Sequence, residues 1–432
     1  MDWMEVAVLV ISFVVLLISG VPISFSIGIS SLFTMLLSIQ TVPALTTVAQ
    51  RMATGIDSFA LLAIPFFILS GQLMNRGGIA RRLINFAKVI VGMLPGGLAY
   101  VNIIAAMMFG AISGSAVAAA AAIGGFMTPL MKKEGYDQNY SAAVNITSAT
   151  TGLIIPPSNI LIVYSLASGG ASIAALFIAG YLPGILVGLS LMFVAGMMAF
   201  RKGYRGGERY SLKQAVLKFL DALPSLLLIV IVIGGIVAGF FTATEASAIA
   251  VLYTAILSIL IYREVKWSEV PKILLDTSAT TAIVMLLIGT SMGMSWIMSY
   301  ENIPQNISTA LIALSSSKVV ILLIINVILL IVGTFMDMTP AVLIFTPIFL
   351  PIVTQLGINP IHFGIIMVLN LSIGLCTPPV GSVLFVGCGI ANTSIAKVIK
   401  PLLPLYVAMI IALLLVSYIP QISLFLPRLF GY

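Results

Sequence analysis

Charged residues are scarce in this chain, and their scarcity limits its class. Of 432 residues only 8% are Asp, Glu, Lys or Arg, whereas 60% are hydrophobic, and the mean hydropathy is +1.20. Such a composition is not that of a soluble domain and indicates a multi-pass membrane protein. At about 20 apolar residues per membrane-spanning helix, the length allows about ten crossings and some shorter segments.

Cysteine, histidine and the common catalytic motifs are equally sparse. Two cysteines and one histidine are too few for a disulfide framework or a metal cluster. The sequence contains neither a phosphate-binding Gly-x-x-x-x-Gly-Lys-Ser/Thr loop nor a zinc-protease His-Glu-x-x-His motif. We therefore expect no enzyme activity and no organic cofactor. Without a phosphate-binding loop, any process that needs energy would have to draw on an ion gradient or on a separate chain.

Two helix-breaking motifs lie in the middle of long apolar segments. Gly152-Leu-Ile-Ile-Pro-Pro-Ser158 falls within 138–168, and Gly374-Leu-Cys-Thr-Pro-Pro-Val-Gly381 falls within 360–390, 222 residues later. Paired prolines remove two amide donors and push the preceding residues out of helical geometry. Broken backbone at mid-membrane is tolerated only against protein or a water-filled cavity. Two such breaks in corresponding positions are typical of the binding site of a secondary transporter.

The other apolar segments follow the same order in both halves of the chain, which indicates an internal duplication. The first half, 1–205, has predicted spans near 4–20, 22–40, 58–75 and 172–200, with an interrupted segment at 98–131. We expect the first span to be retained, because no basic region or cleavage site marks it as a signal peptide. A cytoplasmic linker, 206–221, precedes the second half, 222–432. That half has spans near 222–240, 243–262, 276–300 and 401–420, a polar link at 301–317 and an interrupted segment at 319–356.

Basic residues indicate how the two interrupted segments lie in the membrane. If 98–131 and 319–356 are re-entrant hairpins, each half has five full crossings. Because five is an odd number, the second half starts on the opposite side of the membrane from the first, and the two halves are inverted. With 201–221 in the cytoplasm, 17 of the 20 lysines and arginines are then cytoplasmic, as the positive-inside rule requires. We therefore predict an all-α membrane fold of two inverted-topology repeats, each with about five spans and one re-entrant hairpin. Both termini are predicted to be periplasmic.

The hairpin tips, Ser113-Gly-Ser115 and Asp337-Met-Thr339, should reach the midplane beside the two breaks. The C-terminal ends of half-helices offer carbonyl oxygens to a cation, and the N-terminal ends offer amides to an anion. We predict two or more Na⁺ ions with an anionic substrate between them, since Asp337 is the only carboxylate available to carry a proton at this depth. The candidate Na⁺ ligands are Ser113, Ser115, Asn145, Thr150, Gly152, Asp337, Thr339, Asn370 and Gly374. The candidate substrate-binding residues are Gly114, Ser115, Ser148, Pro156, Thr339, Thr377 and Pro378.

Structural roles compete with these assignments. Polar side chains in membrane helices often bond only to a neighbouring helix, which is the expectation for Asn102 and Asn326. Asp337 could cap the returning half of its hairpin instead of binding a ligand. Glu245 is expected to cap a helix start, and His362 to lie near a helix start at the membrane surface rather than to act as a ligand.

At these motifs the chain resembles the large membrane subunit of tripartite ATP-independent periplasmic (TRAP) transporters, within a wider superfamily of ion transporters. The resemblance covers essentially the whole chain. Its motifs are Ile64-Pro-Phe-Phe-Ile-Leu-Ser-Gly71, Gly114-Ser-Ala-Val-Ala-Ala-Ala-Ala-Ala-Ile-Gly124, Gly135-Tyr136, Thr242-Ala-Thr-Glu-Ala246, His362-Phe-Gly-Ile-Ile366 and the two Pro-Pro motifs. Family hairpins often carry Gly-Ser-Ser, whereas this chain has Ala116 in the last position.

The resemblance implies a bacterial inner-membrane permease that imports an organic acid by an elevator mechanism driven by Na⁺. The acid would be a C4-dicarboxylate, sialic acid or a similar carboxylate. It would be delivered by a periplasmic substrate-binding protein, and a separate small four-helix membrane subunit would complete the transporter. The resemblance also implies that residues 90–180 and 318–395 move, whereas spans within 1–75 and 222–300 form a static scaffold.

Two alternatives remain open from the sequence. One is a stand-alone ion-coupled carrier of the wider superfamily, of the dicarboxylate or arsenite type. The other is an intramembrane hydrolase using Ser113 or Ser115, but the sequence offers no catalytic partner at that depth. The substrate cannot be named, because no arginine lies at the predicted midplane to select one carboxylate.

Overall fold

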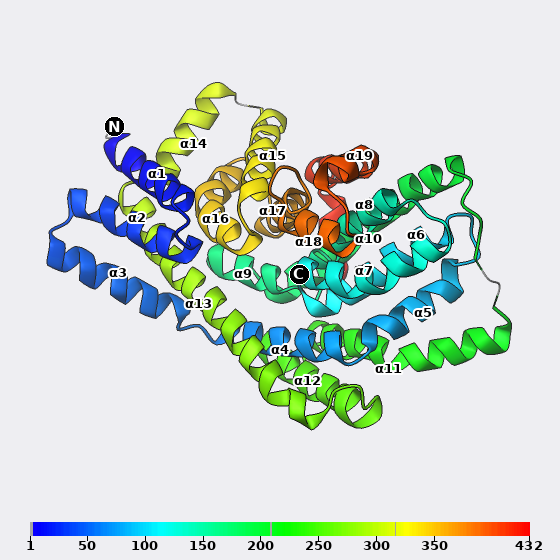
Figure 1. The fold of residues 1–432 in the computed structure, drawn as a ribbon. Coiled ribbons are helices and arrows are strands. Elements are labelled where there is room, and N and C mark those ends of the chain that lie inside the picture. The colour runs from blue at the N-terminus through cyan, green and yellow to red at the C-terminus, as the bar shows by residue number, and fades with distance from the viewer. Residues whose placement is uncertain (1–2, 208–209, 316) are drawn as a thin grey trace.

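The computed structural model describes residues 3–207, 210–315 and 317–432, and within them all regular secondary structure is helical. Eight of the described helices are long and apolar enough to cross a membrane, and four shorter helices are also apolar. Figure 1 shows the α-helices packed into one body, with α1–α3 at one end and α5, α10 and α11 reaching the other. The all-α membrane class is therefore confirmed.

The described residues of the first half form ten α-helices, some of them joined by short 3₁₀ turns. Their bounds are α1 Trp3–Ile18, α2 Ile23–Ser38, α3 Thr41–Ile56, η1 Phe59–Leu62, α4 Ala63–Arg76, α5 Ile79–Val91, α6 Gly97–Ser113, α7 Ala116–Lys133, α8 Gln138–Ala149, η2 Thr150–Leu153, α9 Asn159–Ala167 and α10 Ile173–Arg201.

Ten further α-helices lie in the described part of the second half. Their bounds are α11 Leu212–Val237, α12 Ala243–Ala255, η3 Ile256–Ile261, η4 Trp267–Glu269, α13 Val270–Tyr300, α14 Ile303–Leu314, α15 Lys318–Phe335, α16 Met338–Gln355, α17 Pro360–Gly374, α18 Ser382–Ile390, α19 Ile395–Tyr418 and α20 Gln421–Leu429. Helices α6, α7, α9 and α10 begin 221 to 223 residues before α15, α16, α18 and α19.

Several helical segments differ from the sequence expectations, and α5 and α20 are two that lie outside the predicted spans. Residues 41–56, which received no assignment, form α3, and the predicted polar link 301–317 contains α14. Both were missed because their polar residues lower the apolar signal; α3 carries Gln50 and Arg51 on a largely exposed surface. The predicted linker 206–221 is helical from Leu212, because a capping box between Ser211 and Gln214 starts α11.

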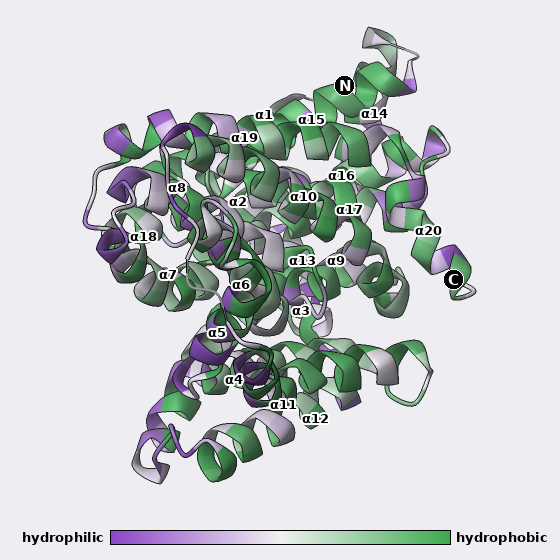
Figure 2. Ribbon diagram, turned by 90° about the vertical axis from the view of Figure 1, so that its right-hand side faces the viewer, coloured by the Kyte–Doolittle hydropathy of each residue, from purple (hydrophilic) through white to green (hydrophobic). Residues whose placement is uncertain are grey.

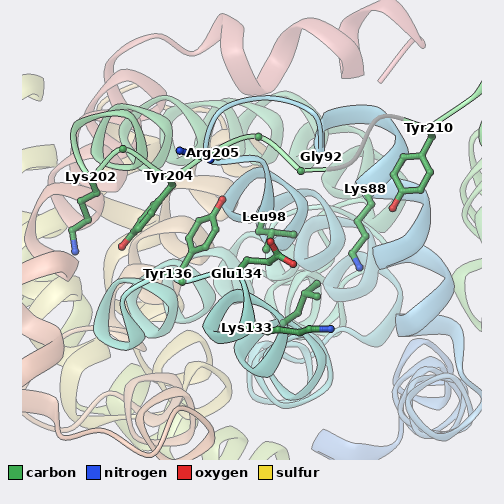
Figure 3. Close-up of a pocket in the computed structure, with 15 residues that line it drawn as sticks. Lys88, Gly92, Leu98, Lys133, Glu134, Tyr136, Lys202, Tyr204, Arg205 and Tyr210 are labelled. Atoms are coloured by element: carbon green, nitrogen blue, oxygen red, sulfur yellow. The ribbon is translucent and has the colours of Figure 1, made fainter.

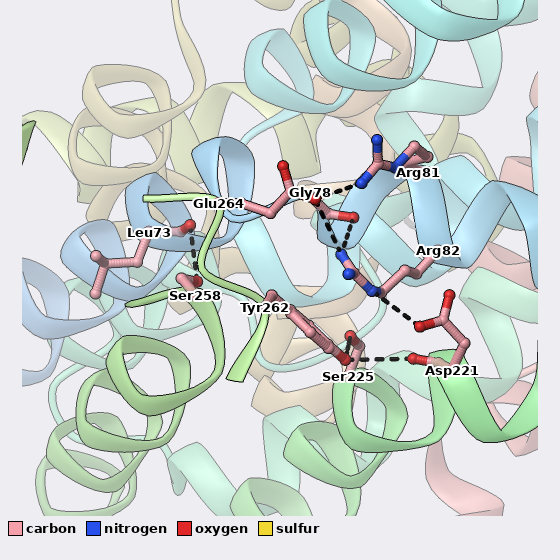
Figure 4. A network of polar contacts seen from close by, with 9 residues as sticks. All are labelled: Leu73, Gly78, Arg81, Arg82, Asp221, Ser225, Ser258, Tyr262 and Glu264. Atoms are coloured by element: carbon pink, nitrogen blue, oxygen red, sulfur yellow. Dashed lines mark hydrogen bonds and ion pairs between the residues drawn. The ribbon is translucent and has the colours of Figure 1, made fainter. Parts of the chain in front are cut away.

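Polar contacts at one edge of the molecule join α5 to α11 and to residues 262–264, which follow η3 (Figure 4). The Arg82 guanidinium lies 3.5 Å from the ring centre of Tyr262 and 3.2 Å from Asp221. Arg81 pairs with Glu264. In the same region Arg76, the last residue of α4, pairs with Asp276 of α13 at 2.7 Å. In Figure 2 the hydrophilic residues gather at this same edge, around α5 and the ends of α7 and α8.

Candidate functional site

The first break divides α8 from α9 within the protein interior. α8 ends at Ala149, a 3₁₀ turn follows, and Pro156 and Pro157 are joined by a cis peptide bond before α9 starts at Asn159. The Ser158 hydroxyl donates to the carbonyl oxygen of Leu153 at 2.6 Å, so part of the interrupted backbone is satisfied locally. Every residue from 140 to 158 is buried.

The second break divides α17 from α18 in a similar way. α17 ends at Gly374, Pro378 and Pro379 are also joined by a cis peptide bond, and α18 begins at Ser382. The Val383 amide donates across the break to the carbonyl oxygen of Leu375 at 3.1 Å. Unlike the first break, this one reaches the surface of the chain, because Pro379 and Val380 are exposed.

A glycine pair joins each hairpin to the broken helix of its own half. A Cβ added to Gly152 would lie 2.2 Å from Gly110 Cα, and one added to Gly374 would lie 2.6 Å from Gly333 Cα. Backbones can approach this closely only where both residues lack a side chain. The first arms of the hairpins, α6 and α15, are therefore fixed against the helix ends that precede the two breaks.

The tip of the first hairpin lies beside the start of α9. A Cβ on Gly114, which has a φ of +62°, would lie 3.0 Å from Asn159 Nδ2. The Ser115 hydroxyl accepts from the Ala118 amide at 3.2 Å and caps α7, so this hydroxyl already has a structural role. Ser113 is buried at the end of α6. The structure thus brings the tip residues to the first break.

The remaining candidates in the first half have specific hydrogen-bond partners. The Ser148 hydroxyl donates to Asn102 Oδ1 at 3.2 Å, and the Thr150 hydroxyl donates to the carbonyl oxygen of Thr147 at 2.8 Å. Asn145 Nδ2 donates to the carbonyl oxygen of Ala120 at 3.0 Å, which ties α8 to α7. Pro156 is buried against α10.

The candidates in the second half divide between buried and exposed positions. Asn370 is buried and donates from Nδ2 to Asn326 Oδ1 at 2.8 Å. The Thr377 hydroxyl donates to the carbonyl oxygen of Ile373 at 2.8 Å and lies 3.2 Å from the Tyr406 hydroxyl. Thr339 is half-buried in the first turn of α16, and Pro378 is half-buried in the break.

Asp337 occupies the N-cap position of α16, but its side chain makes no capping hydrogen bond. It is exposed on this chain, which corrects the expectation of a buried carboxylate at that position. The reason is that the second hairpin tip reaches the surface instead of being enclosed. Glu245 does cap a helix start, through a capping box with Thr242. His362 is buried near the start of α17, where its ring contacts the Ser423 hydroxyl at 2.6 Å.

Two buried amide oxygens near the breaks lack a hydrogen-bond donor. They are Asn145 Oδ1 on α8 and Asn370 Oδ1 on α17. Buried acceptors are normally paired, so an unpaired one indicates an additional ligand or water. A neutral amide oxygen suits a hard cation such as Na⁺. No cluster of three His, Cys, Asp or Glu residues exists in the described part of the chain.

The two broken helices also contact each other directly. The Tyr164 hydroxyl of α9 donates to the carbonyl oxygen of Pro360 of α17 at 2.6 Å, and Gly387 of α18 packs against Ile146 of α8. The second arms of the hairpins cross between the halves, since α7 packs on α18 and α16 packs on α9. Both breaks and both hairpins therefore form one contiguous structure.

Sequence reasoning did not connect three residues with the candidate site that they contact. Asn102 and Asn326 were expected only to bond neighbouring helices, which they do, but their partners are the candidate residues Ser148 and Asn370. The available signal was their spacing: the two asparagines lie 224 residues apart, close to the repeat offset, in the first arms of the two hairpins. Tyr406 on α19 had no sequence signal that linked it to Thr377.

Apolar spans, two helical hairpins and two interrupted helices are typical of a multi-pass membrane transport protein. A family model described as "Tripartite ATP-independent periplasmic transporter, DctM component" matches residues 10–422. The chain belongs to this family, the large permease subunits of TRAP transporters.

Curated relatives agree with the family over nearly the full chain. It is 59% identical to the uncharacterized protein YgiK of Salmonella typhimurium, over 97% of this chain and 96% of YgiK. It is 39% identical to the C4-dicarboxylate TRAP transporter large permease protein DctM of Rhodobacter capsulatus, over 97% of this chain and 98% of that protein. It is 42% identical to the isethionate TRAP transporter permease protein DctMQ of Oleidesulfovibrio alaskensis, over 96% of this chain and 65% of that protein.

Among solved structures, the chain resembles the YdaH transporter of Alcanivorax borkumensis. The TM-score is 0.66, with 91% of each chain covered. The sequence identity is 15%, so the likeness shows the fold alone.

Proposed function

We propose that this permease subunit imports an organic acid together with Na⁺, and that the two breaks and two hairpin tips form its transport site. The observation that carries the proposal is the pair of unpaired amide oxygens, Asn145 Oδ1 and Asn370 Oδ1, one on each broken helix. Each lies on a helix that ends at a break, where free carbonyl oxygens also gather. A cation bound at each break would coordinate both the unpaired amide oxygen and the free carbonyl oxygens.

Helix directions support an inverted duplication. α4 and α12 run in the same direction, because Thr244 donates to the carbonyl oxygen of Phe59 near their starts and Ser258 donates to that of Leu73 farther along. α2 and α13 also run in the same direction, since Gly28 packs on Thr290 and Met35 on Ile297. The Arg76–Asp276 pair joins the end of α4 to the first part of α13, so these two helices are opposed. The counterparts α2 and α12 therefore point in opposite directions.

Backbone groups, rather than side-chain charges, would recognise the substrate. The starts of α7, α9, α16 and α18 gather at the two breaks and hairpin tips, and the amides of a first helical turn lack intrahelical partners. Their positive dipole ends favour a carboxylate or sulfonate group. The names of two relatives specify a C4-dicarboxylate and isethionate, which are both small organic anions. We propose a substrate of this type, with sialic acid as a further member of the class.

Two sets of contacts support a division into scaffold and transport parts. Ion pairs join α4 to α13, and join α5 to α11 and to Glu264, while α12 packs against α4 and α11. Buried polar contacts instead join the hairpins to the broken helices, as in Asn102–Ser148 and Asn326–Asn370. We propose that the second group moves relative to the first as an elevator, carrying the substrate across the membrane.

A periplasmic binding protein and a small membrane subunit complete the proposed transporter. In support of the latter, this chain covers only 65% of the relative named DctMQ. We place the assembly in a bacterial inner membrane, with both termini on the periplasmic side.

Uptake into proteoliposomes tests this function. The binding protein is first titrated with C4-dicarboxylates, isethionate and sialic acid, and the acid that binds is then used as radiolabelled substrate. Uptake should require this chain, the small subunit, the binding protein and an inward Na⁺ gradient. Equal uptake with K⁺ in place of Na⁺ would exclude Na⁺ coupling, and uptake by this chain alone would identify a stand-alone carrier.

A further inference from the structure

A large basic pocket lies away from the transport site, between α5, the α7–α8 turn and the segment that follows α10 (Figure 3). Its volume is about 900 Å³. We call it the basic pocket. It is lined by Lys88, Gly92, Leu98, Leu130, Lys133, Glu134, Gly135, Tyr136, Lys202, Gly203, Tyr204, Arg205, Gly206, Gly207 and Tyr210.

Positive charge dominates this pocket. Among the described residues, four cationic side chains line it, against one carboxylate, that of Glu134. Lys202 lies 3.6 Å from Asp137. For the exposed side chains of Lys133 and Arg205, no carboxylate among the described residues lies within salt-bridge distance. Both side chains line the pocket and are exposed, and this arrangement favours an anionic ligand.

The walls of the basic pocket are fixed by stacking and backbone hydrogen bonds. The rings of Tyr136 and Tyr204 stack with centres 4.2 Å apart, and the Tyr204 hydroxyl accepts from the Asp137 amide at 2.9 Å. On the opposite side the Gly207 amide donates to the carbonyl oxygen of Gly92 at 2.9 Å. Burial raises the pKa of Tyr136, so its hydroxyl stays neutral at physiological pH. The pocket is thus preformed.

An apolar groove of about 610 Å³ adjoins the basic pocket. The two share the end of α5, the start of α6 and the end of α10, where Phe200 of the groove is two residues from Lys202 of the pocket. Phe193 and Phe200 are 74% and 77% exposed. The groove is lined by Val91, Leu94, Tyr100, Leu189, Met192, Phe193, Gly196, Met197 and Phe200.

We propose that an anionic phospholipid binds here, with its phosphate headgroup in the basic pocket and an acyl chain in the apolar groove. A cationic hollow at the end of membrane helices suits a lipid phosphate. The adjoining groove favours a lipid over free phosphate, because an acyl chain can pack against its exposed aromatic side chains and free phosphate cannot. The ligand would stabilise the contact between α5 and the α7–α8 turn, and it is separate from the transported acid.

Lipid binding to the purified full-length chain in detergent tests the proposal, with native mass spectrometry as the readout. Phosphatidylglycerol should bind at least about ten-fold more tightly than phosphatidylcholine with the same acyl chains, since each nearby cation favours an anionic surface. The double variant Lys133→Gln, Arg205→Gln should lose this preference. The matched control Lys397→Gln, Lys400→Gln removes two exposed cations elsewhere and should retain it.

A second variant and a competitor distinguish the two sources of phosphate. Phe200→Ser should weaken phosphatidylglycerol binding several-fold, and millimolar inorganic phosphate should not displace the lipid. Equal binding of the two lipids, or a lipid preference that survives the double variant, would overturn the proposal. Displacement by inorganic phosphate together with normal binding to Phe200→Ser would identify a free-phosphate site instead.

Discussion

Gly152→Ala should destabilise the protein, because the added methyl group would overlap backbone atoms of a neighbouring helix. The new Cβ would lie 2.2 Å from Gly110 Cα, 2.5 Å from Gly110 C and 2.9 Å from Ala111 N, and all three are backbone atoms of α6. Ordinary contacts begin near 3.4 Å, so α6 would have to move by about 1 Å or more. Overpacking of this kind typically costs about 1–3 kcal/mol.

Thermal unfolding in detergent measures this cost. One kcal/mol shifts the midpoint by about 2–4 °C in a domain of 150–250 residues, so we expect a fall of about 2–12 °C. The control Gly125→Ala lies on α7 of the same hairpin with nothing within 4 Å of the new Cβ, and it should lose no stability. Equal midpoints for the two variants would refute the proposed close contact between α6 and the first break. Gly374→Ala provides the same test in the second half.

Three further predictions concern the ion, the ion-pair network and a helix cap. Asn370→Ala should raise the Na⁺ concentration for half-maximal uptake about ten-fold or more, because it removes an unpaired buried oxygen; an unchanged Na⁺ dependence would exclude this residue as a ligand. Arg82→Gln should lower stability by about 1 kcal/mol, mainly through lost stacking on Tyr262, since the partly exposed ion pairs contribute little. Arg201→Gln, which replaces an exposed cation, is its control in thermal unfolding and should show no loss. Thr242→Ala should cost about 1 kcal/mol by removing the cap of α12; a loss no larger than that of Arg201→Gln would argue against the capping box.

Local backbone chemistry explains why the breaks could be located from the sequence. Paired prolines cannot continue a helix, and α8 and α17 end shortly before them. Local chemistry also marked the first hairpin turn, because Gly114 ends α6 with a positive φ and Ser115 caps the start of α7. Capping chemistry also identified the role of Glu245, because Thr-x-x-Glu is a local signal.

Tertiary features could not be predicted in this way. The exposure of Asp337 depends on which elements cover the second hairpin tip, and no local pattern encodes that. The contact between Gly110 and Gly152 joins helices whose crossing point is set by the whole fold. Helix α3 is amphipathic and too polar to stand out in a hydropathy profile.

The inverted arrangement is the central claim, and labelling from defined sides of the membrane tests it most directly. Lys132 and Thr354 are both exposed and lie 222 residues apart, at corresponding ends of α7 and α16. Single variants Lys132→Cys and Thr354→Cys are made in a background that lacks Cys376 and Cys388, and are treated with a membrane-impermeant thiol reagent. The inverted arrangement predicts that position 132 reacts only from the cytoplasmic side and position 354 only from the periplasmic side. Reaction of both positions from the same side would contradict it.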